Sequence, residues 1–498
     1  MFQRVLNRSD MIKCILCDDA PCSHACKKTD PAAMLRSIWF DDEKVAACKM
    51  PADNPCIDCD APCEDACLRS GEVPVRNLMM RLHDEVKSDL EIDIPEDNTC
   101  LRSDICGIPI ENPFLLSSSV VASTYDMCAR AFEAGWAGAA FKTICTFDIH
   151  EASPRFSAIK GADGSMIGFK NIEQLSDHSL KENMEIFRRL KDNYPGKFLL
   201  ASIMGQNDEE WEHLARLCEE NGADAIELNF SCPNMAEEHL GSDIGQVPEL
   251  VERFTKAARR GASIPILAKL TPNVASMDPA VDAAIRGGAD GIAAINTIKS
   301  IIGVNPHTYI SAPAVKNMSA VGGYSGNAVK PIALRFITEI ALNKGMKDKH
   351  ISGMGGVETW LDALEFILLG AGSIQVTTAV MQYGYRIIDD LKAGLNYYLN
   401  EKGFKSVAEA RGLALDSVSE TTDVLERDTV IFPKFDKDKC IGCGRCAISC
   451  DDGGHQAIRL GADRKIMFYG KKCVGCHLCV LVCPQGAITS SYKRITKK

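Results

Sequence analysis

The sequence predicts an α/β protein built on a (β/α)8 TIM barrel, with a cysteine-rich module near each end of the chain. Eight short apolar runs alternate with amphipathic helical stretches through the middle of its 498 residues. Nine cysteines fall between Cys14 and Cys67 and eight between Cys440 and Cys483, which leaves six for the long stretch between them. Cysteine-dense segments with few large apolar side chains are typical of metal-organised modules, so the middle must supply its own hydrophobic core.

The apolar runs of the middle are four to six residues long and are separated by helical patterns such as EEWEHLARLCEENGAD. Repeated strand and helix patterns of this kind predict a parallel sheet. Eight units over about 290 residues suit a barrel, whose usual length is roughly 250 residues before insertions. A doubly wound open sheet is the structural alternative. The expected strands are Phe114–Ser118, Ala139–Thr143, Phe198–Ile203, Ala225–Phe230, Ile266–Leu270, Gly291–Asn296, His350–Gly353 and Ile374–Thr378.

Composition and charge narrow the class of protein. The formal net charge of −11 argues against nucleic acid as a partner, because nucleic-acid binding normally requires a basic domain or stripe. No window approaches 18 consecutive apolar residues, and the start of the chain lacks the apolar region of a secretory signal. We therefore expect a cytoplasmic protein without a membrane segment. In that compartment cysteine clusters bind metal more often than they form disulfides.

The C-terminal cysteines follow the spacing C-x2-C-x2-C-x3-C twice, in CIGCGRCAISC and CVGCHLCVLVCP. In such a pair the first three cysteines of one run bind one [4Fe–4S] cluster and the fourth reaches the other cluster. Structural zinc is the alternative, but it favours paired C-x2-C knuckles. Asp451 follows the fourth cysteine of the first run, where proline is usual. The expected ligand sets are Cys440, Cys443, Cys446 and Cys483 for one cluster, and Cys473, Cys476, Cys479 and Cys450 for the other.

The N-terminal cysteines form the runs CILCDDAPCSHAC and CIDCDAPCEDAC, with Cys48 between them. Eight paired cysteines again fit two [4Fe–4S] clusters, while zinc or redox-sensing dithiols remain alternatives. These cysteines are Cys14, Cys17, Cys22, Cys26, Cys56, Cys59, Cys63 and Cys67. The expected domains are an N-terminal α-helical iron–sulfur domain (1–98), the barrel (99–400), a linker (401–434) and a ferredoxin-like 2[4Fe–4S] domain (435–498).

Polar residues follow the expected strands at the end where barrels carry their chemistry. The glycine-rich turns GGYSG and SGMGG suit a phosphate, because their backbone N–H groups can surround an anion. Lys142 and Lys269 lie at strand ends and would be costly to bury without an anionic partner. A reduced flavin could be that partner. The candidate cofactor-binding residues are Ser118, Ser119, Lys142, Thr143, Lys269, Gly323, Ser325, Gly326, Gly355, Gly356, Thr377 and Thr378.

Several motifs along the barrel resemble one superfamily of FMN-binding barrels. NFSCPN, AKLTPN, GGADGIAAINT, GGYSG and SGMGG, in that order, resemble the dihydropyrimidine and dihydroorotate dehydrogenases. GFKNIEQ and the span from about Asn112 to Cys483 look like the FMN chain of the bacterial NAD-dependent dihydropyrimidine dehydrogenases. The N-terminal runs resemble the iron–sulfur domain of dihydropyrimidine dehydrogenase and of the glutamate synthase small subunit. The resemblance implies reduction of uracil or thymine in pyrimidine catabolism.

The resemblance also assigns roles to individual residues. FMN would give a hydride, and Cys232 would be the general acid on a mobile loop, with an ordinary thiol pKa near 8.5. In this family the N-terminal clusters interleave the two cysteine runs: Cys14, Cys17, Cys22 and Cys67 on one, and Cys26, Cys59 and Cys63 on the other. We place Cys56 as the fourth ligand of the second, with Cys48 in reserve. The residues expected to bind the pyrimidine are Asn171, Glu173, Asn229, Ser231, Asn296 and Thr297.

No segment provides the strand, G-x-G-x-x-G turn and helix of a dinucleotide site. We therefore expect FAD and NAD(P)H on a partner subunit, or ferredoxin as the electron donor, and an oligomeric enzyme. An iron–sulfur-fed dihydroorotate dehydrogenase or related flavin ene-reductase is the alternative enzyme. The motif ends in Asn234, as in dihydroorotate enzymes, where dihydropyrimidine dehydrogenases usually have histidine. A non-catalytic electron-transfer hub is the alternative of another class, and acidity disfavours an RNA-modifying dihydrouridine synthase.

Overall fold

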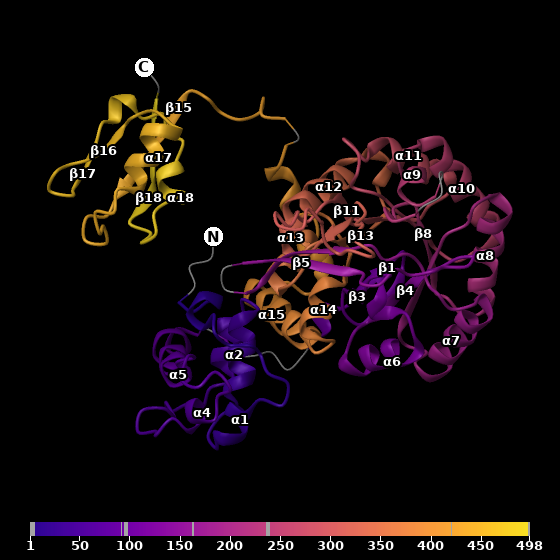
Figure 1. The fold of residues 1–498 in the computed structure, drawn as a ribbon, viewed down its shortest axis with the longest axis horizontal. Coiled ribbons are helices and arrows are strands. Elements are labelled where there is room, and N and C mark those ends of the chain that lie inside the picture. Colours follow the sequence, from indigo (N-terminus) through magenta and orange to yellow (C-terminus); the bar gives the residue numbers. More distant parts are fainter. Residues whose placement is uncertain are drawn as a thin grey trace. The chain divides into compact units, whose positions relative to one another are not determined.

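The computed structural model describes residues 5–90, 92–93, 98–161, 164–235, 240–419 and 421–496. The chain divides into two compact units, Met1–Val418 and Ser419–Lys498, whose elements are labelled in Figure 1. The first unit holds the barrel and the N-terminal cysteines, and the second holds the C-terminal cysteines. Residues 401–418 belong to the first unit, and the domain boundaries at 98, 400 and 434 stay predictions.

The centre of the first unit is a closed barrel of eight parallel strands, which confirms the predicted (β/α)8 fold. Each strand lies within or overlaps one of the eight predicted runs. Around the barrel the order is β10, β13, β14, β3, β4, β7, β8 and β9, and β9 pairs with β10 to close it. The strands are β3 Phe114–Leu116, β4 Gly138–Ile144, β7 Phe198–Ile203, β8 Ala225–Asn229, β9 Ile266–Lys269, β10 Gly291–Ala294, β13 His350–Met354 and β14 Ser373–Val376.

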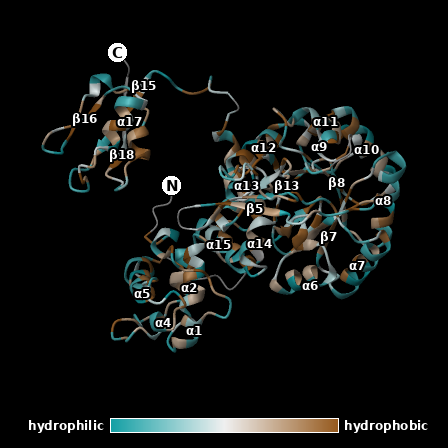
Figure 2. Cartoon of the chain, in the orientation of Figure 1, coloured by the Kyte–Doolittle hydropathy of each residue, from teal (hydrophilic) through white to brown (hydrophobic). Residues whose placement is uncertain are grey.

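Helices surround the strands, and several begin at the residue types that satisfy free backbone N–H groups. Ser179 and Glu182 form a capping box at the start of α7, and Thr124 caps α6. Figure 2 shows hydrophilic residues along outer helices such as α8 and α10. The helices are α6 Tyr125–Ala134, α7 Leu180–Asn193, α8 Asp208–Glu220, α9 Ser242–Gly245, α10 Pro248–Gly261, α11 Asp278–Gly287, α12 Lys330–Leu342, α13 Trp360–Leu368, α14 Thr378–Tyr383, α15 Ile387–Lys402 and α16 Val407–Ala410.

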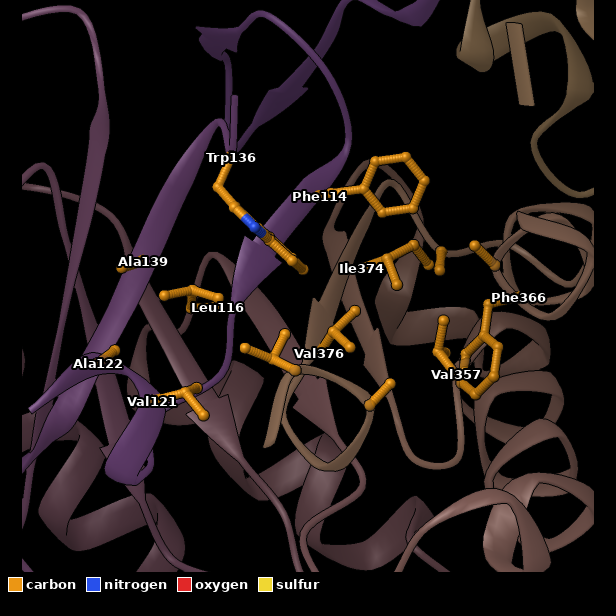
Figure 3. Close-up of a cluster of buried hydrophobic side chains, with 14 of the residues drawn as sticks. Phe114, Leu116, Val121, Ala122, Trp136, Ala139, Val357, Phe366, Ile374 and Val376 are labelled. Carbon is orange, nitrogen blue, oxygen red and sulfur yellow. The ribbon is translucent and has the colours of Figure 1, made fainter. Parts of the chain in front are cut away.

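The core between strands and helices is filled by large apolar side chains. Figure 3 shows Phe114, Ile374 and Phe366 packed among smaller aliphatic residues, with Trp136 beside them. The Trp136 indole is fully buried, and its N–H donates to the carbonyl of Tyr385 at 2.9 Å. Complete burial of a Phe or Ile side chain, as at Phe114 and Ile374, contributes about 1.5–3 kcal/mol. Because the strands of the barrel are parallel, their carboxyl ends lie on the same side.

Small sheets lie at the two ends of the barrel. An antiparallel sheet of order β11, β12, β6 and β5 is inserted after the carboxyl ends of β4 and β10. A hairpin of β1 and β2 packs Ile105 and Ile110 against the amino-terminal parts of the strands, where they join a separate apolar cluster. The bounds are β1 Ser103–Ile105, β2 Ile108–Ile110, β5 Phe156–Lys160, β6 Met166–Asn171, β11 Ile298–Ser300 and β12 Gly322–Ser325.

The N-terminal module is helical and packs directly on the barrel, so that the two share one apolar cluster. Phe40 lies edge-on to Tyr383 with ring centroids 5.1 Å apart, and Arg36 pairs with Asp390 at 2.8 Å. The indole of Trp360 donates to the carbonyl of Asp41 at 3.0 Å. The helices are α1 Pro21–Ala25, α2 Pro31–Trp39, α3 Glu43–Cys48, α4 Pro62–Asp65 and α5 Val75–Arg81, followed by a π-helical turn Leu82–Val86.

The second unit is a small two-sheet module with its own core, in which Cys446, Ile458, Cys479 and Ile488 are buried. No helix in the described part of the chain is long and apolar enough to cross a membrane. The elements are β15 Thr429–Phe435, α17 Arg445–Gly453, β16 Ile458–Leu460, β17 Ile466–Phe468, α18 Leu478–Leu481 and β18 Ile488–Thr496. Short 3-10 turns are Arg8–Met11, Lys87–Asp89, Thr99–Leu101, Val120–Ala122, Asn327–Val329, Lys344–Met346, Leu415–Ser417 and Gly470–Lys472.

Candidate active site

A pocket of about 1090 Å³, including the space open to solvent at its mouth, lies at the carboxyl ends of the barrel strands, where a (β/α)8 fold carries its chemistry. Seventeen of the residues predicted from the sequence to bind cofactor or substrate, or to act as the acid, line this one pocket. They are Ser118, Ser119, Lys142, Thr143, Asn171, Glu173, Asn229, Cys232, Lys269, Asn296, Thr297, Ser325, Gly326, Gly355, Gly356, Thr377 and Thr378.

Two predicted residues, Ser231 and Gly323, lie behind this lining. The Ser231 hydroxyl accepts from the Asn296 amide at 2.8 Å and donates to the Asn229 amide oxygen at 2.8 Å. A side chain at Gly323 would place its Cβ 2.2 Å from the hydroxyl of Thr297, so only glycine fits there. Both residues therefore position lining residues.

The pocket lysines are paired with carboxylates of the protein, which corrects the expectation that a flavin would be needed to balance them. Lys269 Nζ lies 3.2 Å from Glu227 Oε1, and both side chains are buried. Lys142 Nζ lies 3.2 Å from Glu173 and 3.5 Å from Glu151. Each buried ammonium is thus compensated within the chain, as burial of a charge requires.

Glu227, a buried carboxylate that was not predicted from the sequence, contacts residues of the pocket lining. Its carboxylate is fully buried beneath the pocket, where it accepts from Ser118 at 2.7 Å and from the Gln375 amide at 3.0 Å. Residues two apart in a strand face the same way, so Glu227 and Asn229 both project into the barrel. A single carboxylate within an otherwise apolar strand was the signal that could have revealed it.

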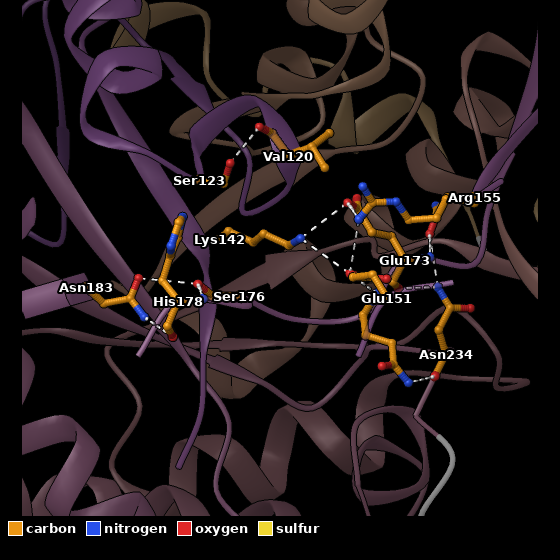
Figure 4. A network of polar contacts seen from close by, with 12 residues as sticks. Val120, Ser123, Lys142, Glu151, Arg155, Glu173, Ser176, His178, Asn183 and Asn234 are labelled. Atoms are coloured by element: carbon orange, nitrogen blue, oxygen red, sulfur yellow. Dashed lines mark hydrogen bonds and ion pairs between the residues drawn. The ribbon is translucent and has the colours of Figure 1, made fainter. Parts of the chain in front are cut away.

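Around Lys142, charged groups from three segments converge, as Figure 4 shows. Arg155 reaches Glu173 at 3.3 Å, and the Glu151 carboxylate accepts from the backbone N–H of Gln174 at 2.9 Å. Burial raises the pKa of Glu173, which Lys142 and Arg155 counteract. The network therefore fixes the turn after β6, which carries Glu173 toward the pocket.

Cys232 lies in the loop that follows β8, which ends at Asn229, and is 6% exposed. Burial raises the pKa of its thiol to about 11, above the ordinary value of about 8.5 expected from the sequence. The thiol is therefore protonated at neutral pH. The loop that follows was expected to be mobile; its residues 236–239 lie outside the described part of the chain.

Asn234 connects the Cys232 loop to the turn after β6. Its amide donates to the Asn171 side chain at 3.0 Å and to the carbonyl of Glu173 at 2.7 Å (Figure 4). The Gln174 side-chain amide in turn donates to the carbonyl of Asn234 at 3.3 Å. These bonds hold the thiol-bearing loop and the amide-bearing turn in one arrangement. No binding role was predicted for Asn234 or Gln174.

One side of the pocket is suited to a phosphate group. Gly355 and Gly356 have φ of +122° and +81°, and a Cβ at Gly356 would lie 2.8 Å from the backbone nitrogen of Lys330. Only glycine adopts such a turn easily, and it lets an anion approach the backbone closely. Hydroxyl pairs flank the turn: Ser325 with Thr378 at 2.9 Å, and Ser119 with Thr377 at 3.1 Å.

Buried polar atoms of the lining still lack partners within the described structure. They include the side-chain oxygens Oε1 of Gln375, Oδ1 of Asn234 and Oε1 of Glu358. Buried acceptors without a donor are costly, and a bound molecule that carries N–H and O–H groups would satisfy them. The lining therefore fits a large polar ligand such as a flavin.

The N-terminal cysteines surround two separate hollows, in the two sets expected from the sequence. The first hollow is lined by Cys14, Cys17, Cys22 and Cys67, and the second by Cys26, Cys56, Cys59 and Cys63. Burial, with the neighbouring thiols, raises the pKa of Cys14, and it raises that of Cys63 to about 11. Thiols that repel one another's ionised forms are suited to a polynuclear cation. Among the described residues no three His, Cys, Asp or Glu side chains converge on a single ion.

In the second unit, one of the two expected cysteine sets lines a hollow. Cys450, Cys473, Cys476 and Cys479 surround it, which joins the fourth cysteine of the first run to three of the second. Cys440 and Cys443 lie close enough to Cys446 to raise the pKa of its thiol, after the larger effect of burial. His477 does not join these ligands, since it bonds the carbonyl of Ile431 at 2.8 Å.

Comparison with known proteins defines the class to which this barrel belongs. Residues 100–399 match the dihydroorotate dehydrogenase family, and residues 434–490 match the 4Fe–4S dicluster domain. The first match spans more than half of the chain. The chain therefore belongs to the dihydroorotate dehydrogenase family of FMN oxidoreductases and carries a 4Fe–4S domain.

Individual relatives place the chain more narrowly within that family. It is 54% identical over 353 residues to the NAD-dependent dihydropyrimidine dehydrogenase subunit PreA of Escherichia coli (strain K12), covering 71% of this chain and 86% of the relative. It is 37% identical over 346 residues to the chloroplastic dihydropyrimidine dehydrogenase (NADP(+)) of Arabidopsis thaliana, covering 67% and 81%. The catalytic subunit of dihydroorotate dehydrogenase B (NAD(+)) of Pyrococcus furiosus is 38% identical over 319 residues, covering 63% and 98%.

Proposed function

We propose that this chain is the catalytic chain of a dihydropyrimidine dehydrogenase, an oxidoreductase that reduces the 5,6 double bond of uracil and thymine. The observation that carries the proposal is the buried Cys232 thiol in a pocket of amide side chains and paired charges. The 54% identity to a dihydropyrimidine dehydrogenase subunit, against 38% to a dihydroorotate dehydrogenase subunit, supports the same reaction.

The charges of the pocket favour an uncharged pyrimidine over orotate. Orotate carries a carboxylate, for which a binding site would supply a cation. Within the described residues, Lys142, Lys269 and Arg155 already face carboxylates of the chain. The amides of Asn171, Asn229 and Asn296, with the hydroxyl of Thr297, offer the donors and acceptors that an imide edge needs.

FMN, when bound, supplies the hydride for one carbon of the double bond. Gly355 and Gly356, with Ser325 and Thr378, would hold its phosphate, and Lys142 and Lys269 would face its ring system. Cys232 keeps a proton at its sulfur and gives it to the other carbon, after which it regains one from water. The raised thiol pKa keeps the acid form available at neutral pH.

Electrons would reach the pocket through four [4Fe–4S] clusters, two at the N-terminal hollows and two in the 4Fe–4S domain. Sixteen cysteines in sets of four supply the ligands. We place FAD and NAD(P)H on a partner subunit, with ferredoxin as the alternative donor, and we propose a cytoplasmic oligomer. A cluster-fed dihydroorotate dehydrogenase or ene-reductase and an electron-transfer hub are the competing functions.

A turnover assay with different electron sources tests the proposal. Purified chain with NADH or NADPH and uracil should give no dihydrouracil, whereas reduced ferredoxin, a chemical reductant or an FAD-containing partner should restore the reaction. Strong oxidation of NAD(P)H by the chain alone would contradict the division of cofactors. Reduction of orotate in preference to uracil would contradict the substrate, and no reduction of any pyrimidine would favour the hub.

A further inference from the structure

The interior of the barrel holds a column of polar side chains that are hydrogen-bonded to one another from one end to the other. Branched apolar side chains normally fill this space in a (β/α)8 barrel. Buried polar groups are costly unless each is satisfied, so an extended network inside a core indicates a role beyond packing. The members of the column, each at most 4% exposed, are His350, Ser373, Ser352, Gln375, Glu227 and Lys269.

The column begins at the amino-terminal end of the barrel. His350 is the first residue of β13 and lines a hollow of about 1160 Å³, including space open to solvent. A Cβ at Gly372 would lie 2.8 Å from Cε1 of His350, so the glycine leaves room for the imidazole. Burial, followed by the charge of Arg411, lowers the pKa of His350 to about 3, although Asp104 opposes the shift. The ring is therefore neutral at physiological pH.

The hydrogen bonds of the column run in one direction. The Ser373 hydroxyl donates to Ser352 Oγ at 2.9 Å. Its oxygen is therefore free to accept from Nε2 of the neutral His350 ring, also at 2.9 Å. Ser352 accepts a second hydrogen bond, from the amide nitrogen of Gln375 at 3.1 Å. Residues two apart in a strand face the same way, which places all four side chains inside the barrel.

The column ends at a cation of the active-site pocket. The amide nitrogen of Gln375 also donates to Glu227 Oε2 at 3.0 Å. Only the nitrogen of an amide can donate to a carboxylate, so this contact fixes which way the amide points. The other carboxylate oxygen, Oε1, lies 3.2 Å from Nζ of Lys269, which lines the pocket. Gln375 therefore connects the serines of the column to the buried ion pair.

We infer that Gln375 is a positioning residue that, held by this column, fixes Glu227 against Lys269 and thereby sets the reduction potential of the flavin. The inference deepens the proposed function and rests on it. A flavin gains negative charge on reduction, and a buried cation that faces it favours this change. Glu227 offsets the cation, and the N–H group of Gln375 in turn offsets part of the charge of the carboxylate.

This arrangement predicts shifts of opposite sign for two neighbouring residues. Without the N–H group of Gln375, the carboxylate of Glu227 acts on Lys269 with its full charge. The pocket then becomes more negative, and the flavin becomes harder to reduce. Without the charge of Glu227, Lys269 is uncompensated and the flavin becomes easier to reduce. A general loss of packing would not move the two potentials in opposite directions.

Anaerobic redox titration of the FMN-loaded chain, followed by flavin absorbance, tests the role of Gln375. Gln375→Met, which keeps the side-chain length and removes the donors, should lower the flavin reduction equilibrium by about threefold or more, or about 14 mV for two electrons. Ser352→Ala should shift the potential in the same direction by less. Thr338→Val is the matched control, because it removes a buried hydroxyl from α12, outside the column. A smaller change in Gln375→Met, or an equal fall in Thr338→Val, would overturn the inference.

A double-mutant cycle tests whether Gln375 acts through Glu227. Glu227→Gln should raise the potential, and adding Gln375→Met to it should cause no further fall, because the charge that Gln375 offsets is gone. An undiminished fall in the double variant would overturn the inference.

The far end of the column gives a test that keeps Glu227 and Gln375 in place. His350→Leu removes the donor to Ser373 and should lower the potential, whereas His350→Gln, which supplies an amide donor, should restore it. Equal potentials in these two variants would contradict the column. Unchanged potentials in a chain that reduces uracil would overturn this inference alone, whereas absence of FMN from the purified chain would overturn the proposed function as well.

Discussion

The active-site pocket and the N-terminal hollows treat buried charge in opposite ways. In the pocket, the Nζ atoms of Lys142 and Lys269 each lie within hydrogen-bonding distance of a carboxylate oxygen, at 3.2 Å in both cases. In the first hollow, Cys14 is surrounded by other thiols that raise its pKa in addition to burial. The lysine charges of the pocket are therefore balanced by carboxylates of the chain, whereas the thiols of the hollows need a bound cation.

The pocket and the hollows therefore differ in whether their geometry is formed before a ligand binds. A pocket whose ion pairs are made within the chain keeps its geometry before the substrate arrives and is ready for the reaction. A ring of thiols gains its stability from the metal it binds, so binding and folding are coupled. Variants of the pocket should therefore change stability and chemistry separately, while variants of the hollows should change both together.

The largest expected effect comes from Glu227→Gln, which breaks the buried pair with Lys269. Removing one partner of such a pair costs about 3–5 kcal/mol, because the other charge remains buried. We expect the thermal transition of the FMN-loaded chain, followed by flavin fluorescence, to fall by about 5 °C or more. Glu111→Gln is the control, since it removes a half-exposed partner of Lys197 and should change little. Equal transitions for both variants would show that the pair does not preorganise the pocket.

Cys232→Ala should separate chemistry from stability. We expect turnover with uracil to fall by about 10² or more, the usual scale for a lost general acid, with FMN content unchanged. Cys218→Ala, a buried thiol in α8 away from the pocket, is the matched control and should keep normal turnover. Steady-state assays and flavin absorbance measure both quantities. Near-normal turnover in Cys232→Ala would mean that Cys232 is not the proton donor.

Iron content tests whether the N-terminal hollows bind clusters. Four clusters give about sixteen irons per chain after anaerobic purification. Cys56→Ser should lower this number by about four, because Cys56 lines the second hollow, whereas Cys48→Ser should leave it unchanged. A value near eight with zinc present in the unaltered chain would mean that the N-terminal module holds no clusters. Loss of about four irons in Cys48→Ser with none in Cys56→Ser would make Cys48 the fourth ligand instead.

The smallest expected effect is in the dependence on pH. Burial raises the pKa of Cys232 to about 11, and the protonated form is the acid. The rate of flavin oxidation by uracil should therefore change less than about twofold between about pH 7 and 9.5 and decline only as the pH approaches that value. Single-turnover rates across this range provide the measurement. A decline with an apparent pKa near 8.5 would mean that the thiol titrates as in water.

Much of this architecture could be predicted from periodicity and spacing. The eight strands and the polar strand ends follow from local patterns, whereas the grouping of the N-terminal cysteines was expected only from the family resemblance. The partners of Lys142 and Lys269 could not be predicted, because Glu227 and Glu173 meet them only when the barrel closes. The pKa of Cys232 likewise depends on burial, which a motif does not reveal. Glu227 and Gln375 are each a polar residue within an apolar strand, and their side chains meet at 3.0 Å inside the closed barrel.

The most direct test of the central claim is anaerobic flavin spectroscopy of the intact chain. Photoreduced enzyme is mixed with uracil, thymine or orotate, and reoxidation of the flavin is followed in a single turnover without any electron donor. The account predicts rapid reoxidation by uracil or thymine and little by orotate, because the pocket cations are already paired. Faster reoxidation by orotate than by uracil would contradict it.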